Sequence, residues 1–209
     1  MSVLQQLKWR YATKSFDKDR LLSDNQIQTL KEAFNLTATS YGLQTLKLVV
    51  VKDKSLRQEL VKHAYNQAQV LDASHLLVLC VQNQIDASDV ESHFDNLQRI
   101  RQTPDAVISP FKSHLTETIS QMPEDKKLTW AINQAYIALG NLMTVCAMEE
   151  IDSCPMEGFI PEAFDEVLGL NEIGLKSVLL LPVGFRSKTD FFSDLKKVRK
   201  DLSQTVIEM

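Results

Sequence analysis

The stretch "HLLVLCV" at residues 75–81 is apolar at every position after the first and has the length of a strand. A strand that is apolar throughout, rather than at alternate positions, is typical of a sheet covered on both faces. Two further stretches have strand character, "LKLVVV" at 46–51 and "KSVLLLPVG" at 176–184. The sequence therefore predicts one central sheet that is enclosed on both faces.

Helical patterns separate these strands. "SDNQIQTLKEAFNL" at 23–36 begins with Ser23 or Asp24 as an N-cap and continues with apolar residues at helical spacing. Further helices are expected over about 55–63 and from Pro161 in "PEAFDEVLGL". Strands that alternate with helices, without repeats or Gly/Ser linkers, indicate an α/β or α+β fold with three layers around one sheet.

A polar, mostly helical excursion occupies about 87–122, and Pro123 is placed for the first helical position, N1, of the helix after it. Within that helix, "LTWAINQAYIALGNLMTVCAM" at 128–148 carries no charged residue over the length of a membrane span. Asn133, Gln134 and other polar residues interrupt it. A helix buried in the core or at a subunit interface is therefore favoured over a membrane helix.

The composition argues against several classes of protein. The net charge of −4 does not favour binding to nucleic acid or to an anionic membrane. Cys80, Cys146 and Cys154 lie in apolar surroundings without metal-ligand spacing, so we expect reduced core cysteines. The start, "MSVLQQLKWR", lacks the apolar run of a signal peptide, which favours a cytoplasmic protein.

Several common catalytic motifs are missing. No two of the six glycines form a G-x-G pair, so neither a Rossmann fingerprint nor a phosphate-binding P-loop is present. The four histidines have no metal-binding spacing, and His75, which opens a buried strand, is expected to be packed rather than to bind a metal. No G-x-S-x-G motif supports a serine hydrolase. The remaining candidates are dispersed along the chain.

Cations gather near both ends of the sequence. "WRYATKSF" at 9–16 places Arg10 and Lys14 among aromatic residues, and "LKKVRK" contains Lys197 and Arg199. Guanidinium and ammonium groups are the usual donors to phosphate, so these four cations could converge on one phosphate group. A helix end with ordinary surface cations and a solvated basic tail are the alternatives.

Two further segments offer polar groups to a ligand. In "AYNQAQVLDASH", Asn66 and Gln69 are one helical turn apart, which suits two amide contacts to one flat polar edge. "CPMEGF" at 154–159 places Glu157 and Gly158 after a short strand, where backbone N–H groups can face a ligand. Amides on the exposed face of a turn, and an ordinary strand-to-helix turn, explain these segments equally well.

The order of these segments is more specific than any one of them. "RYATKSFD", "TATSYGLQ", "NQAQVLDASH", "WAINQAYIALGNLM", "PMEGF" and "KKVR" together resemble the FMN-dependent nitroreductase family over nearly the whole of residues 1–209. The nearest likeness is to bacterial oxygen-insensitive NAD(P)H nitroreductases and dihydropteridine reductases. The resemblance implies an α+β three-layer sandwich with a mostly antiparallel sheet, and a homodimer that binds FMN at the subunit interface.

The resemblance also implies roles for individual residues. Arg10 would hold the FMN phosphate, with Tyr11 and Ala12 beside it, while Lys14 would reach the ribityl chain and the pyrimidine edge. The N–H of Glu157 would point at flavin N5, which makes Lys14 and Glu157 the expected catalytic residues. The other expected contacts of this subunit are Lys197 and Arg199 at the phosphate, Asn66 and Gln69 at the pyrimidine end, and Pro155, Met156 and Gly158 at one ring face.

The second subunit would complete each site. The residues expected to approach the flavin of the other subunit are Ala38, Thr39, Ser40, Gly42 and Gln134. Several positions depart from the family pattern. Tyr11 and Ala12 replace a basic or histidine residue and a serine, and Gln69 replaces a lysine found in some relatives. "GLQTLK" keeps Gln44 but lacks the N-x-Q-P-W pattern that is common in the family. The excursion at 87–122 would cover the substrate, with Phe111 as a candidate aromatic contact.

The implied reaction is a two-electron, ping-pong hydride transfer. NADH or NADPH would reduce the flavin and leave, and a nitroaromatic, a quinone or a related acceptor would then be reduced. A nicotinamide that stacks on the flavin needs no Rossmann motif, and flavin chemistry needs no protein nucleophile. A non-catalytic flavin-binding or storage protein is the alternative, as is a family offshoot that acts on flavin or on halogenated aromatics.

Overall fold

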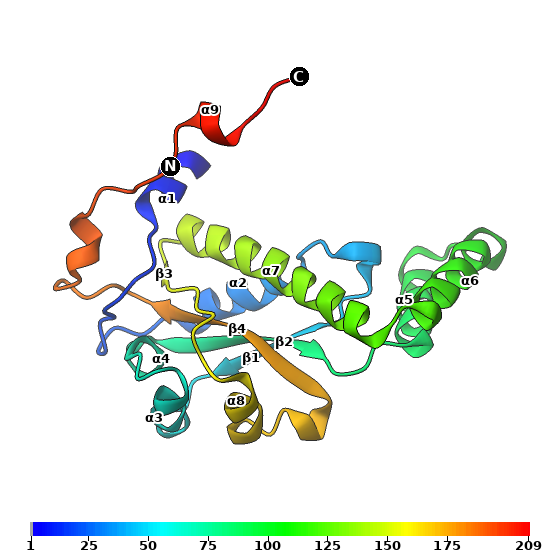
Figure 1. Ribbon diagram of the computed structural model, residues 1–209, viewed down its shortest axis with the longest axis horizontal. Coiled ribbons are helices and arrows are strands. Elements are labelled where there is room, and N and C mark those ends of the chain that lie inside the picture. The colour runs from blue at the N-terminus through cyan, green and yellow to red at the C-terminus, as the bar shows by residue number, and fades with distance from the viewer. Residues whose placement is uncertain (1) are drawn as a thin grey trace.

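The computed structural model describes residues 2–209 and places an antiparallel sheet between two layers of helices (Figure 1). The strands are β1 (Leu46–Val51), β2 (His75–Gln82), β3 (Asp152–Ser153) and β4 (Leu175–Gly184), in the spatial order β1-β2-β4-β3. The helices are α1 (Val3–Trp9), α2 (Asp24–Asn35), α3 (Lys54–His63), α4 (Gln69–Asp72), α5 (Ala87–Arg101), α6 (Asp105–Gln121), α7 (Glu124–Met148), α8 (Pro161–Val167) and α9 (Leu202–Thr205). The predicted three-layer α+β sandwich is confirmed.

The two faces of β2 explain the continuous apolar run that predicted it. Leu77 and Leu79 belong to the core formed with α2 and α7, whereas Leu76 and Val78 belong to the core formed with α3 and α8. Figure 1 shows α2 and α7 on one side of the sheet and α3, α4 and α8 on the other. Because both faces are covered, no position of this strand can be polar without a partner.

Local signals set the ends of two helices. Ser23 forms a capping box with Gln26 at the start of α2, as the N-cap prediction required. The prediction for Pro123 is wrong by one position, because Pro123 is the N-cap of α7 and Glu124 is its first helical residue. The backbone of Pro123 is extended (ψ 146°), so the helix begins only after it.

The excursion between β2 and α7 consists of α5 and α6. Figure 1 shows this helix pair extending away from one end of the sheet. Phe94 of α5 is buried and meets the ring of Phe111 of α6 edge to face, with 5.7 Å between the centroids. The buried apolar residues of the pair, among them Phe94 and Leu115, belong to the same core as α2, α7 and one face of the sheet.

The N-terminal loop after α1 runs beside β3 and beside the segment that follows β4. The N–H of Thr13 donates to the carbonyl oxygen of Ser153 at 3.2 Å, and the N–H of Ser187 donates to that of Ser15 at 2.8 Å. The chain beyond β4 then passes to α9, on the side of the molecule that carries α1 (Figure 1). These contacts bring the two cationic segments of the sequence together.

Candidate functional site

A cavity of about 640 Å³ lies between the N-terminal loop and the segment after β4. Trp9, Met143 and Phe192 supply apolar parts of its wall. The predicted site residues that line it are Arg10, Tyr11, Ala12, Lys14, Pro155, Lys197 and Arg199. The structure therefore brings the cations from the two ends of the sequence to one place.

The three cations that are expected to bind a phosphate, Arg10, Lys197 and Arg199, have no acidic partner within residues 2–209. Arg10 is half-buried, Lys197 and Arg199 are exposed, and none of the three forms an ion pair within residues 2–209. The Nε atom of Arg10 is buried and has no hydrogen-bond partner in this part of the chain. The Lys197 ammonium group donates to the carbonyl oxygen of Arg10, which places the two residues in contact.

These cations also act on one another. Burial lowers the pKa of Arg10, and the positive charge of Arg199 lowers it further. Burial, Arg10 and Arg199 likewise lower the pKa of Lys197. Because an anion among the three would replace repulsion with attraction, the cluster is suited to a phosphate group, whose oxygens accept several charge-assisted hydrogen bonds.

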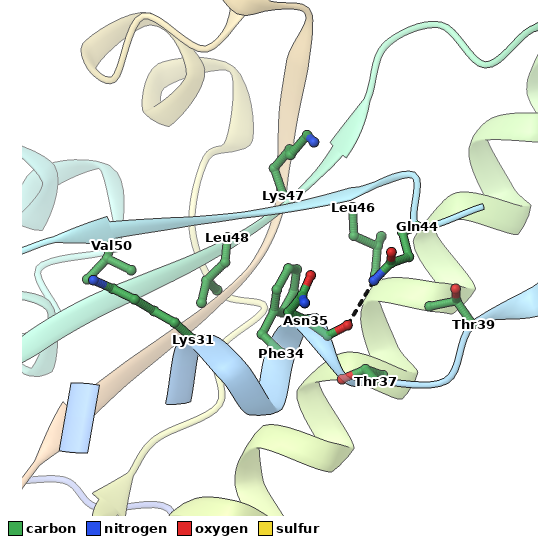
Figure 2. A pocket seen from close by; sticks show the side chains of 10 residues that line it. All are labelled: Lys31, Phe34, Asn35, Thr37, Thr39, Gln44, Leu46, Lys47, Leu48 and Val50. Atoms are coloured by element: carbon green, nitrogen blue, oxygen red, sulfur yellow. Dashed lines mark hydrogen bonds between the residues drawn. The ribbon is translucent and has the colours of Figure 1, made fainter. Parts of the chain in front are cut away.

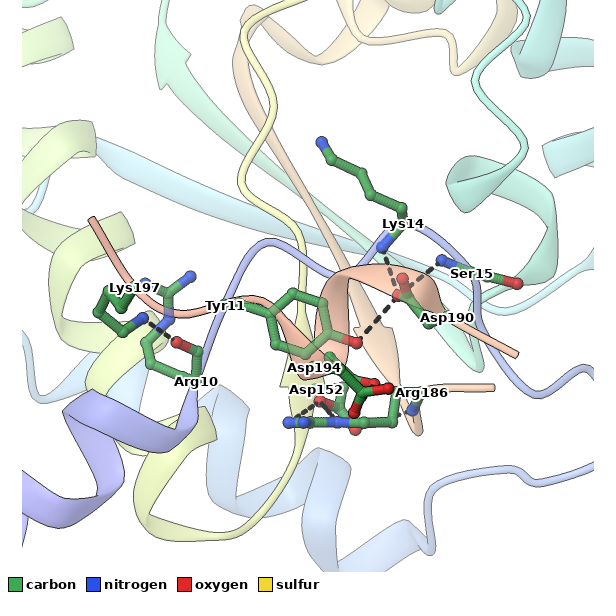
Figure 3. Close-up of polar contacts among 10 residues, drawn as sticks. Arg10, Tyr11, Lys14, Ser15, Asp152, Arg186, Asp190, Asp194 and Lys197 are labelled. Atoms are coloured by element: carbon green, nitrogen blue, oxygen red, sulfur yellow. Dashed lines mark hydrogen bonds and ion pairs between the residues drawn. The ribbon is translucent and has the colours of Figure 1, made fainter. Parts of the chain in front are cut away.

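A buried carboxylate fixes the loop that carries Arg10 and Lys14. Asp190 is 3% exposed, and its Oδ2 atom accepts hydrogen bonds from the Tyr11 hydroxyl (2.9 Å), the Lys14 N–H (2.8 Å) and the Ser15 N–H (3.0 Å). Figure 3 shows the Lys14 side chain pointing away from this carboxylate although its backbone N–H faces it. The Lys14 ammonium group is therefore left exposed at the cavity.

A second polar contact lies beside Tyr11. The Arg186 guanidinium carbon lies 4.6 Å from the centroid of the Tyr11 ring and 4.3 Å from that of Trp9, within cation–π range. Its Nε atom donates to Asp152 Oδ1 at 2.6 Å. Burial and the hydrogen bond to Asp190 raise the pKa of Tyr11, so its hydroxyl stays protonated as a donor.

The loop after β3 presents two free backbone donors. Met156 pairs with Leu180 through both backbone hydrogen bonds, which fixes the start of the loop on β4. Within residues 2–209, the N–H groups of Glu157 and Gly158 donate to no protein acceptor. The Tyr136 hydroxyl of α7 donates to Glu157 Oε1 at 2.8 Å, and this hydrogen bond raises the pKa of Tyr136.

Asn66 and Gln69 do not share a helix, so the expected helical spacing is wrong. Asn66 lies in an exposed turn with a left-handed backbone (φ 58°), whereas Gln69 begins α4 and is 8% exposed. The turn is nevertheless adjacent to the loop after β3, because Gln67 Nε2 donates to the carbonyl oxygen of Gly158 at 2.7 Å.

The loop before β1 is tied to α7 rather than to the cavity. The Ser40 N–H donates to Gln134 Oε1 at 2.8 Å, and Gln134 Nε2 donates to the Trp130 carbonyl oxygen at 3.0 Å. Gly42 has a φ of 73°, and a Cβ atom there would lie 3.0 Å from the His93 ring. The predicted contacts of this region lie outside the 640 Å³ cavity of the chain: Ala38, Thr39, Ser40, Gly42 and Gln134.

A smaller cavity of about 290 Å³ lies between α2 and β1 (Figure 2). Its wall combines Lys31 and Phe34 of α2 with residues of β1, and Gln44 Nε2 donates to the Asn35 carbonyl oxygen at 2.8 Å. Thr39 is the one predicted flavin contact among its lining residues. This cavity lacks the guanidinium groups of the larger one.

Large apolar side chains are exposed on α1 and α7 of the single chain. Leu4 is 69% exposed on α1, and Tyr136 and Ile137 are 44% and 50% exposed on α7. Where exposed apolar side chains gather on one surface, they mark an interaction site. The three cysteines, in contrast, are buried and unpaired, and His75 is 6% exposed, as predicted.

Two absences apply to the part of the chain that the structure describes. Residues 2–209 contain no cluster of three or more histidine, cysteine or acidic side chains that could hold a metal ion. No helix among them has both the length and the apolar character needed to cross a bilayer.

No pattern in the sequence identified Asp190, Arg186, Tyr136 or Gln67 as parts of this site. Their contacts join residues that are far apart in sequence, such as Tyr11 and Asp190, whose separation is 179 positions. Spacing patterns detect only neighbours on one element. The acidic residue in "KTDFF" was the only available signal, and nothing in its surroundings distinguished it from a surface acid.

Known proteins with similar sequences are provisionally named nitroreductases. A family model described as "Nitroreductase family" matches residues 7–185. A Staphylococcus aureus (strain USA300) protein provisionally named an NAD(P)H nitroreductase is 34% identical over 171 residues, which cover 80% of this chain and 77% of that protein. Bacillus subtilis (strain 168) YfkO, with the same provisional name, is 31% identical over 198 residues, or 88% of each chain.

Solved structures agree with this assignment at the level of the fold. A nitroreductase structure from Exiguobacterium sibiricum, in complex with FMN, has a TM-score of 0.88 at 17% identity and covers 100% of this chain and 98% of its own. The Bacillus subtilis ydfN structure also has a TM-score of 0.88, at 19% identity, and covers 99% and 98%. The match to the family model and the identity to the two relatives show that the chain belongs to the nitroreductase family.

Proposed function

We propose that this protein is an FMN-dependent oxidoreductase that uses NADH or NADPH to reduce nitroaromatics, quinones or related acceptors. The observation that carries the proposal is the convergence of Arg10, Lys197 and Arg199 on one cavity, with a buried guanidinium N–H of Arg10 that has no partner in residues 2–209. Membership of the nitroreductase family supports flavin as the ligand.

The donor set suits the phosphate of FMN. Arg10, Lys197 and Arg199 would hold it by charge-assisted hydrogen bonds, which are stronger than neutral ones. Inside the same cavity, Tyr11 and Pro155 offer an aromatic and an apolar surface, as the larger part of a flavin requires. Bound FMN would supply the redox chemistry, accepting two electrons from the nicotinamide and passing them to the acceptor.

Groups of the protein itself would orient the flavin and stabilise its reduced form. The free N–H of Glu157 is a fixed donor, held by the pairing of Met156 with β4 and by the contact of its side chain with Tyr136. The exposed ammonium group of Lys14 would place a positive charge where a reduced flavin gains negative charge. Asn66 and Gln69 would contact the pyrimidine end from the turn that Gln67 ties to Gly158.

A second copy of the chain would complete the site. The exposed apolar side chains of α1 and α7 support a dimer, and proteins of this family are typically dimeric. In that assembly the loop that contains Ser40 would approach the flavin of the other subunit. Gln134 would act there through the hydrogen bond that holds Ser40. Ala38, Thr39 and Gly42 belong to the same loop.

Steady-state kinetics test the proposal. The FMN-loaded protein should oxidise NADH or NADPH in the presence of a quinone, with parallel lines in double-reciprocal plots because donor and acceptor use the same site in turn. The bound flavin should bleach with the nicotinamide alone under anaerobic conditions. Tight FMN binding without any nicotinamide oxidation would contradict the proposal and indicate a flavin carrier.

A further inference from the structure

Asp190 is the last buried residue before the exposed C-terminal segment. It is 3% exposed, and the residues from Phe191 onward are exposed. Its carboxylate receives four hydrogen bonds: three on Oδ2 from the N-terminal loop and one on Oδ1 from the Phe192 N–H at 3.1 Å. Both oxygens are therefore used, one toward each segment.

The carboxylate is ionised at neutral pH. Burial acts to raise the pKa of Asp190, but hydrogen bonds from the N–H groups of Ser15 and Lys14 and from the Tyr11 hydroxyl outweigh it and hold the pKa below its usual value. A charged acceptor strengthens each of these bonds. Asp190 therefore keeps its charge and its hydrogen bonds near pH 7 and does not titrate there.

The two segments that meet at Asp190 carry mutually repelling cations. The N-terminal loop carries Arg10, and the segment after Asp190 carries Lys197 and Arg199. Arg199 lowers the pKa of Arg10, and both arginines lower the pKa of Lys197, as expected for like charges that oppose close approach. The loop and the segment are far apart in sequence, so noncovalent contacts must hold them together. Besides the hydrogen bonds from Ser187 to Ser15 and from Lys197 to Arg10, Asp190 supplies a buried, charged side chain that several donors of the loop share.

We propose that Asp190 is the positioning residue that assembles the phosphate site, because it fastens the loop bearing Arg10 to the segment bearing Lys197 and Arg199. This inference rests on the proposed function, since it assigns the site to the phosphate of FMN. Asp190 itself would not contact the phosphate. It would set the distance between Arg10 on the loop and the two cations of the C-terminal segment, Lys197 and Arg199. Its loss should therefore reduce the preference for FMN over riboflavin, which has the same ring system without the phosphate.

The experiment compares the affinities of FMN and riboflavin for the apoprotein and its variants by fluorescence quenching. Asp190→Ala should weaken FMN about tenfold or more and riboflavin by no more than about threefold, because only the phosphate contacts depend on the tie. Asp190→Asn keeps one side-chain oxygen acceptor, so its affinity for FMN should lie between those of the wild type and of Asp190→Ala. Asp201→Ala, at an exposed carboxylate of the same segment, is the matched control and should change neither affinity.

A double-mutant cycle with Arg10→Ala separates positioning from general stability. If Asp190 acts through the phosphate site, adding Asp190→Ala to Arg10→Ala should weaken FMN by less than about threefold more. Equal losses for FMN and riboflavin, or fully additive losses, would overturn the inference. If Arg10→Ala itself leaves the affinity for FMN unchanged, the phosphate site of the proposed function fails, and the inference fails with it.

Should Asp190→Ala not fold, Tyr11→Phe provides a milder test. It removes one of the hydrogen bonds to Asp190 and leaves the aromatic ring against Arg186. It should reduce the affinity for FMN about two- to fivefold without a change for riboflavin, since one hydrogen bond to a charged group is lost. An identical loss for both ligands would count against the positioning role.

Discussion

The N–H group of Ser40 donates to Gln134 Oε1 at 2.8 Å, and this contact joins the loop before β1 to the middle of α7. Gln134 is 5% exposed and uses its amide nitrogen as well, on the Trp130 carbonyl oxygen. Both polar atoms of its side chain are therefore used within the chain. The contact with Ser40 fixes the position of the loop that contains the predicted flavin contacts Ala38, Thr39, Ser40 and Gly42.

Gln134→Leu should destabilise the protein. The substitution leaves the half-buried Ser40 N–H without its acceptor, which costs about 1–2 kcal/mol in the free energy of unfolding. Urea unfolding at one fixed protein concentration measures this change. Asn133→Leu, at the exposed neighbouring position of α7, is the control. Equal effects of the two substitutions would show that the contact with Ser40 contributes nothing.

Stability should fall as the pH is lowered from about 6.5 to 4 because of His75. Burial, with the nearby charges of Arg57, Lys52 and Lys31, lowers the pKa of His75 to about 4 in the folded protein. The unfolded chain, with an ordinary pKa near 6.5, binds the proton first across this window, so protonation favours unfolding. The effect has an upper bound of about 3 kcal/mol and is complete below the folded-state pKa.

His75→Gln removes this titration and should flatten the curve of unfolding free energy against pH between 4 and 6.5. Ser74 Oγ accepts from the Leu22 N–H and can donate its own hydrogen to His75 Nδ1, a contact that glutamine can partly reproduce. Parallel curves for the wild type and the variant would mean that His75 is protonated alike in both states.

Lys14 should raise the reduction potential of the bound flavin. Its ammonium group is exposed at the cavity and is not used in an ion pair within residues 2–209. Because a positive charge favours the reduced, anionic flavin, Lys14→Ala should lower the midpoint potential by a few tens of millivolts, at about 30 mV per tenfold change for two electrons. Gln69→Lys should raise it.

A spectroelectrochemical titration of the FMN-loaded proteins measures these shifts. Lys188→Ala, at an exposed lysine outside the cavity, controls for a general loss of positive charge. A Lys14→Ala protein that retains FMN with an unchanged potential would identify Lys14 as an ordinary surface cation.

The exposed face of α7 should lie in a dimer interface of the obligate class, which exceeds about 2,000 Å². Ile137→Glu places a charge at the exposed apolar centre of that face and should produce monomers with weakened FMN binding. Ile173→Glu, at a position 65% exposed in the turn before β4, should remain dimeric. Sedimentation velocity distinguishes the two species. A wild-type protein that is a stable, FMN-loaded monomer at micromolar concentration would contradict this assembly.

Periodicity was sufficient to predict the layers of the fold. The unbroken apolar run at 75–81 required cover on both faces, and Leu76 and Leu77 do face different cores. The ends of helices that depend on the backbone angles of a single residue were harder to predict from the sequence. Proline is typical of N1, yet Pro123 adopts the extended backbone of an N-cap. Asparagine tolerates both a helical and a left-handed backbone, so the residue type at position 66 does not decide between them.

Most of the cationic cavity could be predicted from the order of segments, but the groups that hold it together could not. Arg10 and Lys197 are recognisable because cations stand out in sequence. Asp190, Tyr136 and Gln67 act through single long-range hydrogen bonds, and such contacts exist only once the loop, the sheet and the C-terminal segment are packed.

The central claim, that the cluster of Arg10, Lys197 and Arg199 binds the phosphate of FMN, is tested most directly by the ratio of FMN to riboflavin affinity in the unmodified protein. Each charge-assisted contact contributes about 1.5–3 kcal/mol, so FMN should bind at least about a hundredfold more tightly than riboflavin. Arg199→Ala should reduce this ratio about tenfold or more, whereas Lys200→Ala, one position further along, should preserve it. Equal affinities for FMN and riboflavin in the unmodified protein would contradict the account.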